Sequence, residues 1–120
     1  MKNFLGKLFV ASVIGMFMVA TVAGIGFAAD TIKLGVAGPH SGDLASYGIP
    51  TVKAAELVVK DINAKGGVLG KKVELLVEDD VCKPEVSTNT ATKLISQKVD
   101  VVLGHICSGA TKAALGIYRD

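Results

Sequence analysis

VDVVLG, residues 99–104, is an almost unbroken apolar run that ends at a glycine. A short run of this kind is typical of a strand covered on both faces, as the strands of a parallel sheet are. Two similar runs precede it. IKLGV at residues 32–36 stops at Gly38-Pro39, and VELLV at residues 73–77 stops at three acidic residues. The chain therefore contains three predicted strands, each with its own stop signal.

A helical segment is predicted after each strand. Over residues 51–63 apolar residues recur at helical spacing, with Pro50 before them and Gly66-Gly67 after them. A second helix is expected to start at Pro84, and a third to start near Ser108 and run to the end of the chain. Strands that alternate with helices of this length form parallel sheets with right-handed crossovers. The predicted fold class is α/β, a doubly wound parallel sheet.

Residues 1–28 differ from the rest of the chain. They hold 19 apolar residues and two lysines, and the run from Leu8 to Ala29 is uncharged. Because Gly26-Phe27-Ala28 also fits the small-x-small rule, this pattern predicts a secretory signal peptide at residues 1–28, with cleavage before Asp30 as a near alternative. An uncleaved membrane anchor is the rival interpretation, since 22 uncharged residues are long enough to span a bilayer. Glycines within the run and the lack of a charged stop favour the signal peptide.

The charge balance of residues 29–120 excludes one class of function. This part holds 11 basic and 11 acidic residues, whereas a nucleic-acid-binding domain shows a basic face. Its only aromatic residues are Tyr47 and Tyr118, too few for a platform on which bases stack. We therefore expect no nucleic-acid partner.

Both cysteines, Cys82 and Cys107, lie in the part predicted to be exported. An even pair in an oxidising compartment favours a disulfide. The 24 residues between them contain no CxxC spacing and no histidine pair, so the sequence predicts no zinc site.

The predicted topology indicates where a ligand would bind. In an open α/β sheet, ligands bind beyond the carboxyl ends of the strands, where the strand order reverses. With the strand order 2-1-3, the loops at residues 38–50 and 105–109 border that crevice. They contain Ser41, Tyr47 and Ser108.

Ser108 is the strongest of these candidates. It can cap the third helix while its hydroxyl and the amides of Gly109 and Ala110 point outward, an arrangement that suits a carboxylate or a phosphate. The alternative is that Ser108 is only a cap. Tyr47 could supply an apolar wall with a polar tip, or could be a surface tyrosine that packs on its own loop.

The sequence contains no catalytic constellation. Residues 104–111 are spaced like a phosphate-binding loop, but Ala110 stands where a lysine is needed. His105 and Cys107 could suggest a nucleophile pair, but the cysteine is expected to be oxidised. The neighbours Asp79 and Asp80 fit a solvated charge run at a strand end better than a pair of catalytic carboxylates. We expect no enzyme activity, no cofactor and no metal.

Four segments, taken in order and spacing, resemble those of the periplasmic branched-chain amino-acid-binding proteins, the leucine/isoleucine/valine-binding family. They are GPHSGDLASYG at 38–48, DINAKGGVLG at 61–70, EDDVCKP at 78–84 and GHICS at 104–108. The resemblance implies a type I periplasmic binding fold, in which two Rossmann-like lobes joined by a hinge close on a small ligand. It also implies a monomeric, periplasmic substrate-binding component of an ABC transporter, which delivers leucine, isoleucine or valine to an inner-membrane permease.

The resemblance also implies roles for individual residues. By this likeness Ser108 binds the α-carboxylate of the ligand, and Tyr47 lies beside its aliphatic side chain. Cys82 and Cys107 match the disulfide of the family, which lies near the pocket. His40 stands where these proteins have an apolar residue, so the ligand preference could differ.

The chain stops at Asp120, inside the predicted third helix, and three parallel strands would make an incomplete sheet. We therefore expect residues 29–120 to be the N-terminal part of a first ligand-binding lobe, with the rest of that lobe and the second lobe beyond Asp120. The alternatives are the ligand-sensing domain of a receptor with the same fold, an exported enzyme whose catalytic residues lie further on, and an orphan fragment that transports nothing.

Overall fold

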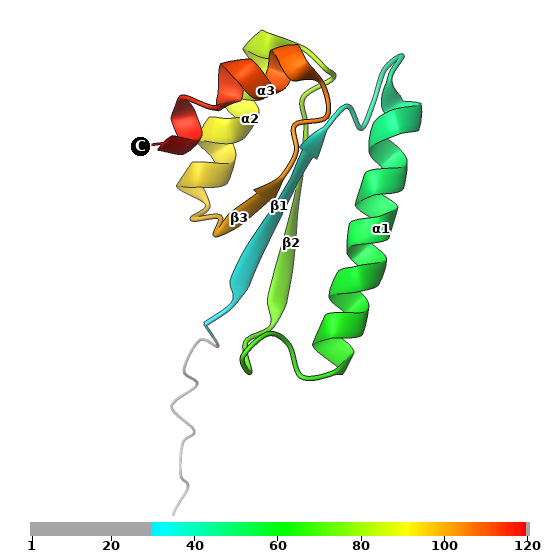
Figure 1. The fold of residues 1–120 in the computed structure, drawn as a ribbon, viewed down its shortest axis with the longest axis vertical. Coiled ribbons are helices and arrows are strands. Elements are labelled where there is room, and N and C mark those ends of the chain that lie inside the picture. The colour runs from blue at the N-terminus through cyan, green and yellow to red at the C-terminus, as the bar shows by residue number, and fades with distance from the viewer. Residues whose placement is uncertain (1–29, 120) are drawn as a thin grey trace, which may run out of the picture.

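The computed structural model describes residues 30–119, so the predicted signal peptide lies outside the described residues. Three parallel strands form one sheet, β1 (Ile32–Gly38), β2 (Val73–Asp79) and β3 (Val101–Leu103). Their order across the sheet is β2-β1-β3 (Figure 1). The α/β fold class is confirmed, and the strand order reverses between β1 and β3, as predicted.

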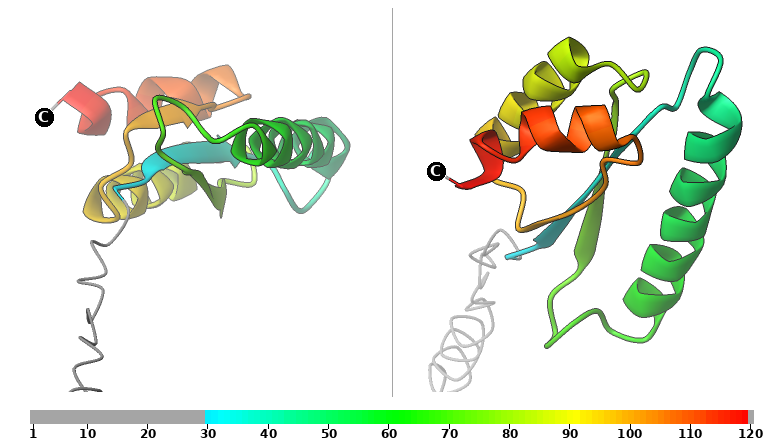
Figure 2. Two further views of the ribbon diagram at one scale, coloured as in Figure 1. Left: turned by 90° about the horizontal axis from the view of Figure 1, so that it is seen from below. Right: turned by 45° about the horizontal axis from the view of Figure 1, so that its top comes forward.

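The helices lie on the two sides of this sheet. α1 (Ala45–Ala64) packs against β1 and β2, whereas α2 (Pro84–Ser96) and α3 (Ser108–Ala114) pack against each other, away from α1 (Figure 2). A short 3-10 helix, η1 (Ile117–Arg119), contacts α2. Right-handed crossovers that leave β1 and β2 in opposite directions must run over opposite faces, which makes the sheet doubly wound.

Buried apolar residues lie on both faces of the sheet, with Ala55 and Val59 of α1 on one side and Leu94 of α2 on the other. Val36 of β1 and Leu94 of α2 are fully buried, as are three alanines, Ala91, Ala110 and Ala114. A Cβ added to Gly35 would lie 3.2 Å from a methyl of Leu94. The missing side chain at this position therefore lets α2 approach β1 closely.

Helix α1 begins at Ala45, so the predicted start at Thr51 is wrong, and residues 45–50 are helix rather than loop. Pro50 was expected to precede the helix but lies inside it. The carbonyl that Pro50 leaves without a donor belongs to Ser46, in an exposed turn where water can replace the lost hydrogen bond. The proline is therefore tolerated near the start of the helix.

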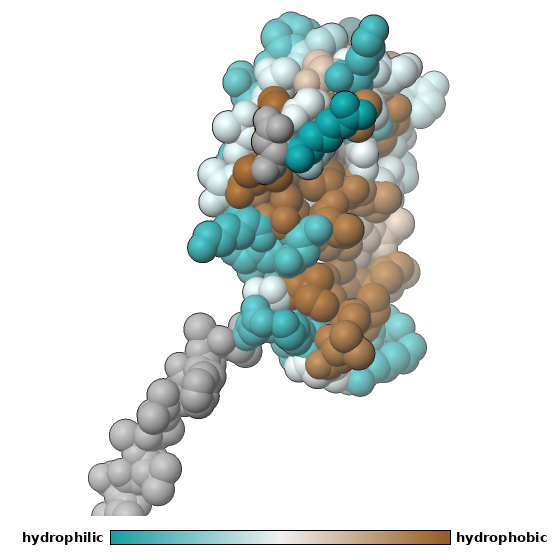
Figure 3. Space-filling model, turned by 60° about the vertical axis from the view of Figure 1, so that its left-hand side comes forward, coloured by the Kyte–Doolittle hydropathy of each residue, from teal (hydrophilic) through white to brown (hydrophobic). Residues whose placement is uncertain are grey.

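β3 is shorter and less covered than expected. Val101 is 57% exposed and Leu103 49%, so the prediction of a strand covered on both faces is wrong for the part that the structure describes. The reason is that β3 forms one edge of the sheet. Figure 3 shows apolar side chains gathered in a band on this side of the molecule.

The third helix also differs from its prediction. α3 ends at Ala114 after 7 residues, and η1 follows it, so the helix does not run to the end of the chain. Between residues 30 and 119, no helix is both long enough and apolar enough to cross a membrane.

Candidate functional site

The predicted ligand-binding loops meet at the C-terminal edge of the sheet. A Cβ on Gly38, at the end of β1, would lie 3.0 Å from the side chain of Ile106 in the β3–α3 loop. Tyr47, in the first turn of α1, is 65% exposed, and Ser108 is exposed as well. The two principal candidates therefore lie in the first turns of α1 and α3, next to these loops, with their side chains accessible.

Ser108 is the first residue of α3, and Cys107 precedes the helix as its N-cap. The expectation that Ser108 caps the helix is wrong, because no side chain makes a capping hydrogen bond there. Its hydroxyl is therefore not used for capping. Of the two weaker candidates beside it, Gly109 is exposed, whereas Ala110 is fully buried.

Ser41, another weaker candidate, is bound to Asp79 at the end of β2. The Ser41 hydroxyl donates to Asp79 Oδ2 at 2.5 Å, and the amides of His40 and Val81 donate to Oδ1 at 2.8 and 2.9 Å. Partial burial by itself raises the pKa of Asp79, but these hydrogen bonds outweigh it and hold the pKa below its usual value. Asp79 thus ties the β1–α1 loop to the end of β2.

Replacing Asp79 with asparagine is expected to lower the free energy of unfolding near neutral pH by about 1 kcal/mol, because hydrogen bonds to a partly solvated charge are weakened. A carboxyl whose pKa is lower in the folded state stabilises the fold above its unfolded pKa, near 4, and this contribution is lost as the pH falls through the folded pKa. Urea unfolding of the native protein and the variant should therefore differ at about pH 7 and converge at about pH 2. A difference that persists in acid would contradict this role of Asp79.

The sulfur atoms of Cys82 and Cys107 are bonded in the structure, with their Cα atoms 5.5 Å apart. The bond joins the β2–α2 loop to the residue immediately before Ser108. Val81 and Cys82 have φ values of 42° and 62°, in the left-handed region that residues other than glycine rarely adopt. The covalent link therefore starts from an unusual turn beside the candidate site.

His40 occupies the interior of the β1–α1 loop. Its two ring nitrogens are buried and have no hydrogen-bond partner among the described residues. Its amide, by contrast, donates to Asp79. The imidazole is therefore enclosed without a hydrogen bond to any residue between 30 and 119.

Sequence reasoning missed a buried polar group beside these loops. Asp80, taken as part of a solvated charge run, is fully buried and contacts His105. The signal in the sequence was present but weak: an aspartate just after the end of β2 and a histidine just after the end of β3, two strands that do not pair with each other. Within residues 30–119, no three histidine, cysteine, aspartate or glutamate side chains converge as a metal site requires.

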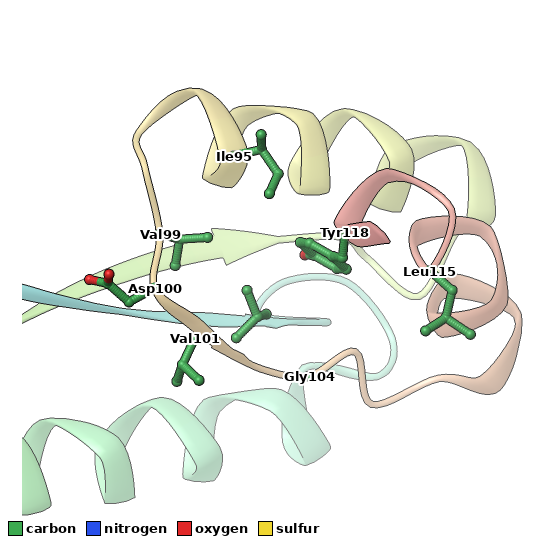
Figure 4. Close-up of a pocket in the computed structure, with 8 residues that line it drawn as sticks. Ile95, Val99, Asp100, Val101, Gly104, Leu115 and Tyr118 are labelled. Carbon is green, nitrogen blue, oxygen red and sulfur yellow. The ribbon is translucent and has the colours of Figure 1, made fainter. Parts of the chain in front are cut away.

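Among the hollows in the described part of the chain, two lie near the predicted loops. The one in Figure 4, about 390 Å³, lies along β3 and is lined mainly by aliphatic side chains from α2, from β3 and from Leu115 just after α3, together with Tyr118. The other, about 580 Å³, lies between the β1–α1 and β2–α2 loops, beside Cys82. Neither is lined by Tyr47 or Ser108, so neither is the predicted crevice.

Comparisons with known proteins agree with this arrangement. A family model described as periplasmic binding protein matches residues 31–120. The leucine-, isoleucine-, valine-, threonine- and alanine-binding protein of Pseudomonas aeruginosa is 39% identical over 97% of this chain and 30% of its own length. The Leu/Ile/Val-binding protein of Escherichia coli is 41% identical over 77% of this chain and 25% of its own length.

A solved structure is similar to this chain in its fold as well as in its sequence. It is the branched-chain amino-acid transporter substrate-binding protein of Streptococcus pneumoniae in complex with isoleucine, with a TM-score of 0.71 and 40% identity over 75% of this chain and 26% of that one. The chain spans between a quarter and a third of the length of the curated relatives described above. With the family model matching nearly every described residue and the parallel β2-β1-β3 sheet in place, the chain belongs to the periplasmic binding protein family.

Proposed function

We propose that this segment is the N-terminal part of the first lobe of an ABC-transporter substrate-binding protein for branched-chain amino acids. The observation that carries the proposal is the match, over 97% of the chain, to a protein named for binding leucine, isoleucine and valine. The site supports it, because two accessible polar side chains lie at the starts of α1 and α3, where the strand order reverses. The role is binding and delivery, with no catalytic step.

In this proposal the Ser108 hydroxyl donates to the α-carboxylate of the amino acid, and the amides of Gly109 and Ala110 lie beside it. Tyr47 covers the aliphatic side chain. Ser41 acts indirectly, since its hydroxyl already donates to Asp79. The remaining contacts come from parts of the protein beyond this segment, because a ligand of this class is usually enclosed on most of its surface.

The proposal also assigns the compartment and the partners. Residues 1–28 direct export to the periplasm, where Cys82 and Cys107 are oxidised to a disulfide. The mature protein is a monomer that needs no cofactor and delivers its ligand to an inner-membrane permease.

Changing Ser108 to alanine in the full-length protein is expected to weaken leucine binding by about 1.5–3 kcal/mol, the range for a lost hydrogen bond to a charged group. The melting temperature should change little, because the hydroxyl is exposed and caps nothing. Isothermal titration calorimetry measures the affinity, and Ser96→Ala serves as the control. Ser96 is an exposed serine at the end of α2, and its hydroxyl bonds only to Lys93 within the same helix. An affinity equal to that of the control would refute the role of Ser108.

A second candidate ligand class is an aromatic acid. A solute-binding protein of Rhodopseudomonas palustris solved in complex with benzoate is 33% identical over 75% of this chain, with a TM-score of 0.65. Benzoate and leucine share a carboxylate, which is the group assigned to Ser108. Titration of the same protein with benzoate separates the two classes, because an aromatic-acid protein should bind benzoate more tightly than leucine.

A further inference from the structure

Asp80, His105 and Tyr118 form one hydrogen-bonded chain at the C-terminal edge of the sheet. Asp80 Oδ2 lies 2.5 Å from His105 Nδ1, and His105 Nε2 lies 3.1 Å from the Tyr118 hydroxyl. The Asp80 and His105 side chains are 0% and 1% exposed. None of the three has a role in the proposed ligand contacts.

The hydrogen-bond partners determine which atom donates. Asp80 Oδ1 already accepts the Cys82 amide at 2.8 Å. An ionised carboxylate can only accept, so His105 Nδ1–H donates to Oδ2. Burial raises the pKa of Tyr118, and the negative charge of Asp80 raises it further, so the phenol keeps its proton and can donate to Nε2.

This chain joins the same two loops as the disulfide. Asp80 is the first residue of the β2–α2 loop and His105 is the second residue of the β3–α3 loop, while Cys82 and Cys107 link the loops two residues further on. The same loop is also bonded to α3, because the Thr111 hydroxyl donates to the carbonyls of His105 and Cys107 at 2.7 and 3.0 Å. The backbone from 105 to 107 is therefore held at both ends, immediately before Ser108.

A buried pair of this kind is a poor source of stability. Two well-packed apolar residues in its place are often neutral or stabilising. What the pair does provide is a fixed loop position, because His105 Nδ1 can bond to the carboxylate at only one position of the loop. The loop it places is the one that presents Ser108.

We propose that His105 is a positioning residue for ligand binding: its buried hydrogen bond to Asp80 holds the β3–α3 loop, and with it the Ser108 hydroxyl, at the C-terminal edge of the sheet. The inference rests on the proposed function, since it deepens the role given to Ser108. It does not depend on which carboxylate ligand is bound.

Two substitutions of similar chemistry test it in the full-length protein. His105→Asn keeps an N–H close to the position of Nδ1, whereas His105→Gln moves it toward the position of Nε2. The asparagine variant should bind leucine within about threefold of the native affinity, and the glutamine variant about tenfold more weakly. Asparagine is the smaller residue and leaves the larger cavity, so it should also be the less stable of the two. Tyr118→Phe, which removes only the Nε2 partner, is the matched control and should bind as the native protein does.

A ligand-independent measurement separates this inference from the proposed function. Hydrogen exchange followed by mass spectrometry should show faster exchange over residues 104–112 in the glutamine variant than in the asparagine variant. If the native protein binds neither leucine nor benzoate, the proposed function fails, and the exchange rates still decide the positioning role. Equal exchange in the two variants, or affinities that simply follow their melting temperatures, would overturn the inference.

Discussion

Replacing Asp80 with alanine is expected to lower the free energy of unfolding of the full-length protein by about 3–5 kcal/mol, because donors left without an acceptor cost about 1–3 kcal/mol each and the lost side chain leaves a cavity. The change leaves two donors without an acceptor, the buried Nδ1–H of His105 and the partly buried amide of Cys82. It also removes a side chain that is fully enclosed. Urea unfolding followed by circular dichroism measures the effect.

Asp80→Asn is the matched control for this change. The amide oxygen can still accept from Cys82, and its NH2 group can donate to His105 once the imidazole adopts its other tautomer. We expect this variant to lose about 1 kcal/mol, the net value of one neutral hydrogen bond. Equal losses in the alanine and asparagine variants would show that the polar contacts of Asp80 do not stabilise the fold.

Changing Gly48 to alanine should destabilise the protein by about 3 kcal/mol, although alanine is the better helix former by about 1 kcal/mol. A Cβ at this position of α1 would lie 2.0 Å from the carbonyl oxygen of Pro39 and 2.6 Å from its carbon. Both are main-chain atoms, so relief requires the β1–α1 loop or the start of α1 to move. Because Tyr47 is the neighbouring residue, leucine affinity should fall together with stability.

Gly116→Ala is the control that separates the steric overlap with Pro39 from the general effect of replacing a glycine. No atom lies within 4 Å of a Cβ at Gly116, so its change in stability should stay within about 0.5 kcal/mol. Thermal unfolding of both variants makes the comparison. A Gly48 variant as stable as the Gly116 variant would mean that α1 does not approach Pro39 this closely.

The sequence was sufficient for the strands and the topology, because those depend on local signals. The apolar runs and their stops predicted β1 and β2 closely, and Pro84 marked the first residue of α2. The predicted start of α1 failed, because a proline can stand before a helix or inside its first turns. The pattern predicts a helix start at Thr51, directly after Pro50, but the exposed turn before the proline can solvate the carbonyl that loses its donor, so α1 begins at Ala45.

The remaining errors involve contacts between distant residues. Burial of Asp80 depends on His105, which is 25 residues away and was read as part of a different pattern. How exposed Val101 and Leu103 are depends on what packs next to the edge strand β3, and a local sequence pattern does not reveal this. Spacing along the chain predicts which residues lie at a strand end, but only the packed structure shows which of them are paired.

The central claim is that this segment belongs to an exported, two-lobed binding protein. The most direct test is the intact mass of the protein purified from the native periplasm, measured with and without reduction. The account predicts a mass several times that of residues 29–120, an N-terminus at Ala29, and a gain of two hydrogens on reduction of the Cys82–Cys107 bond. A periplasmic species with the mass of residues 29–120 alone, or a protein that keeps residues 1–28 and two free thiols, would contradict it.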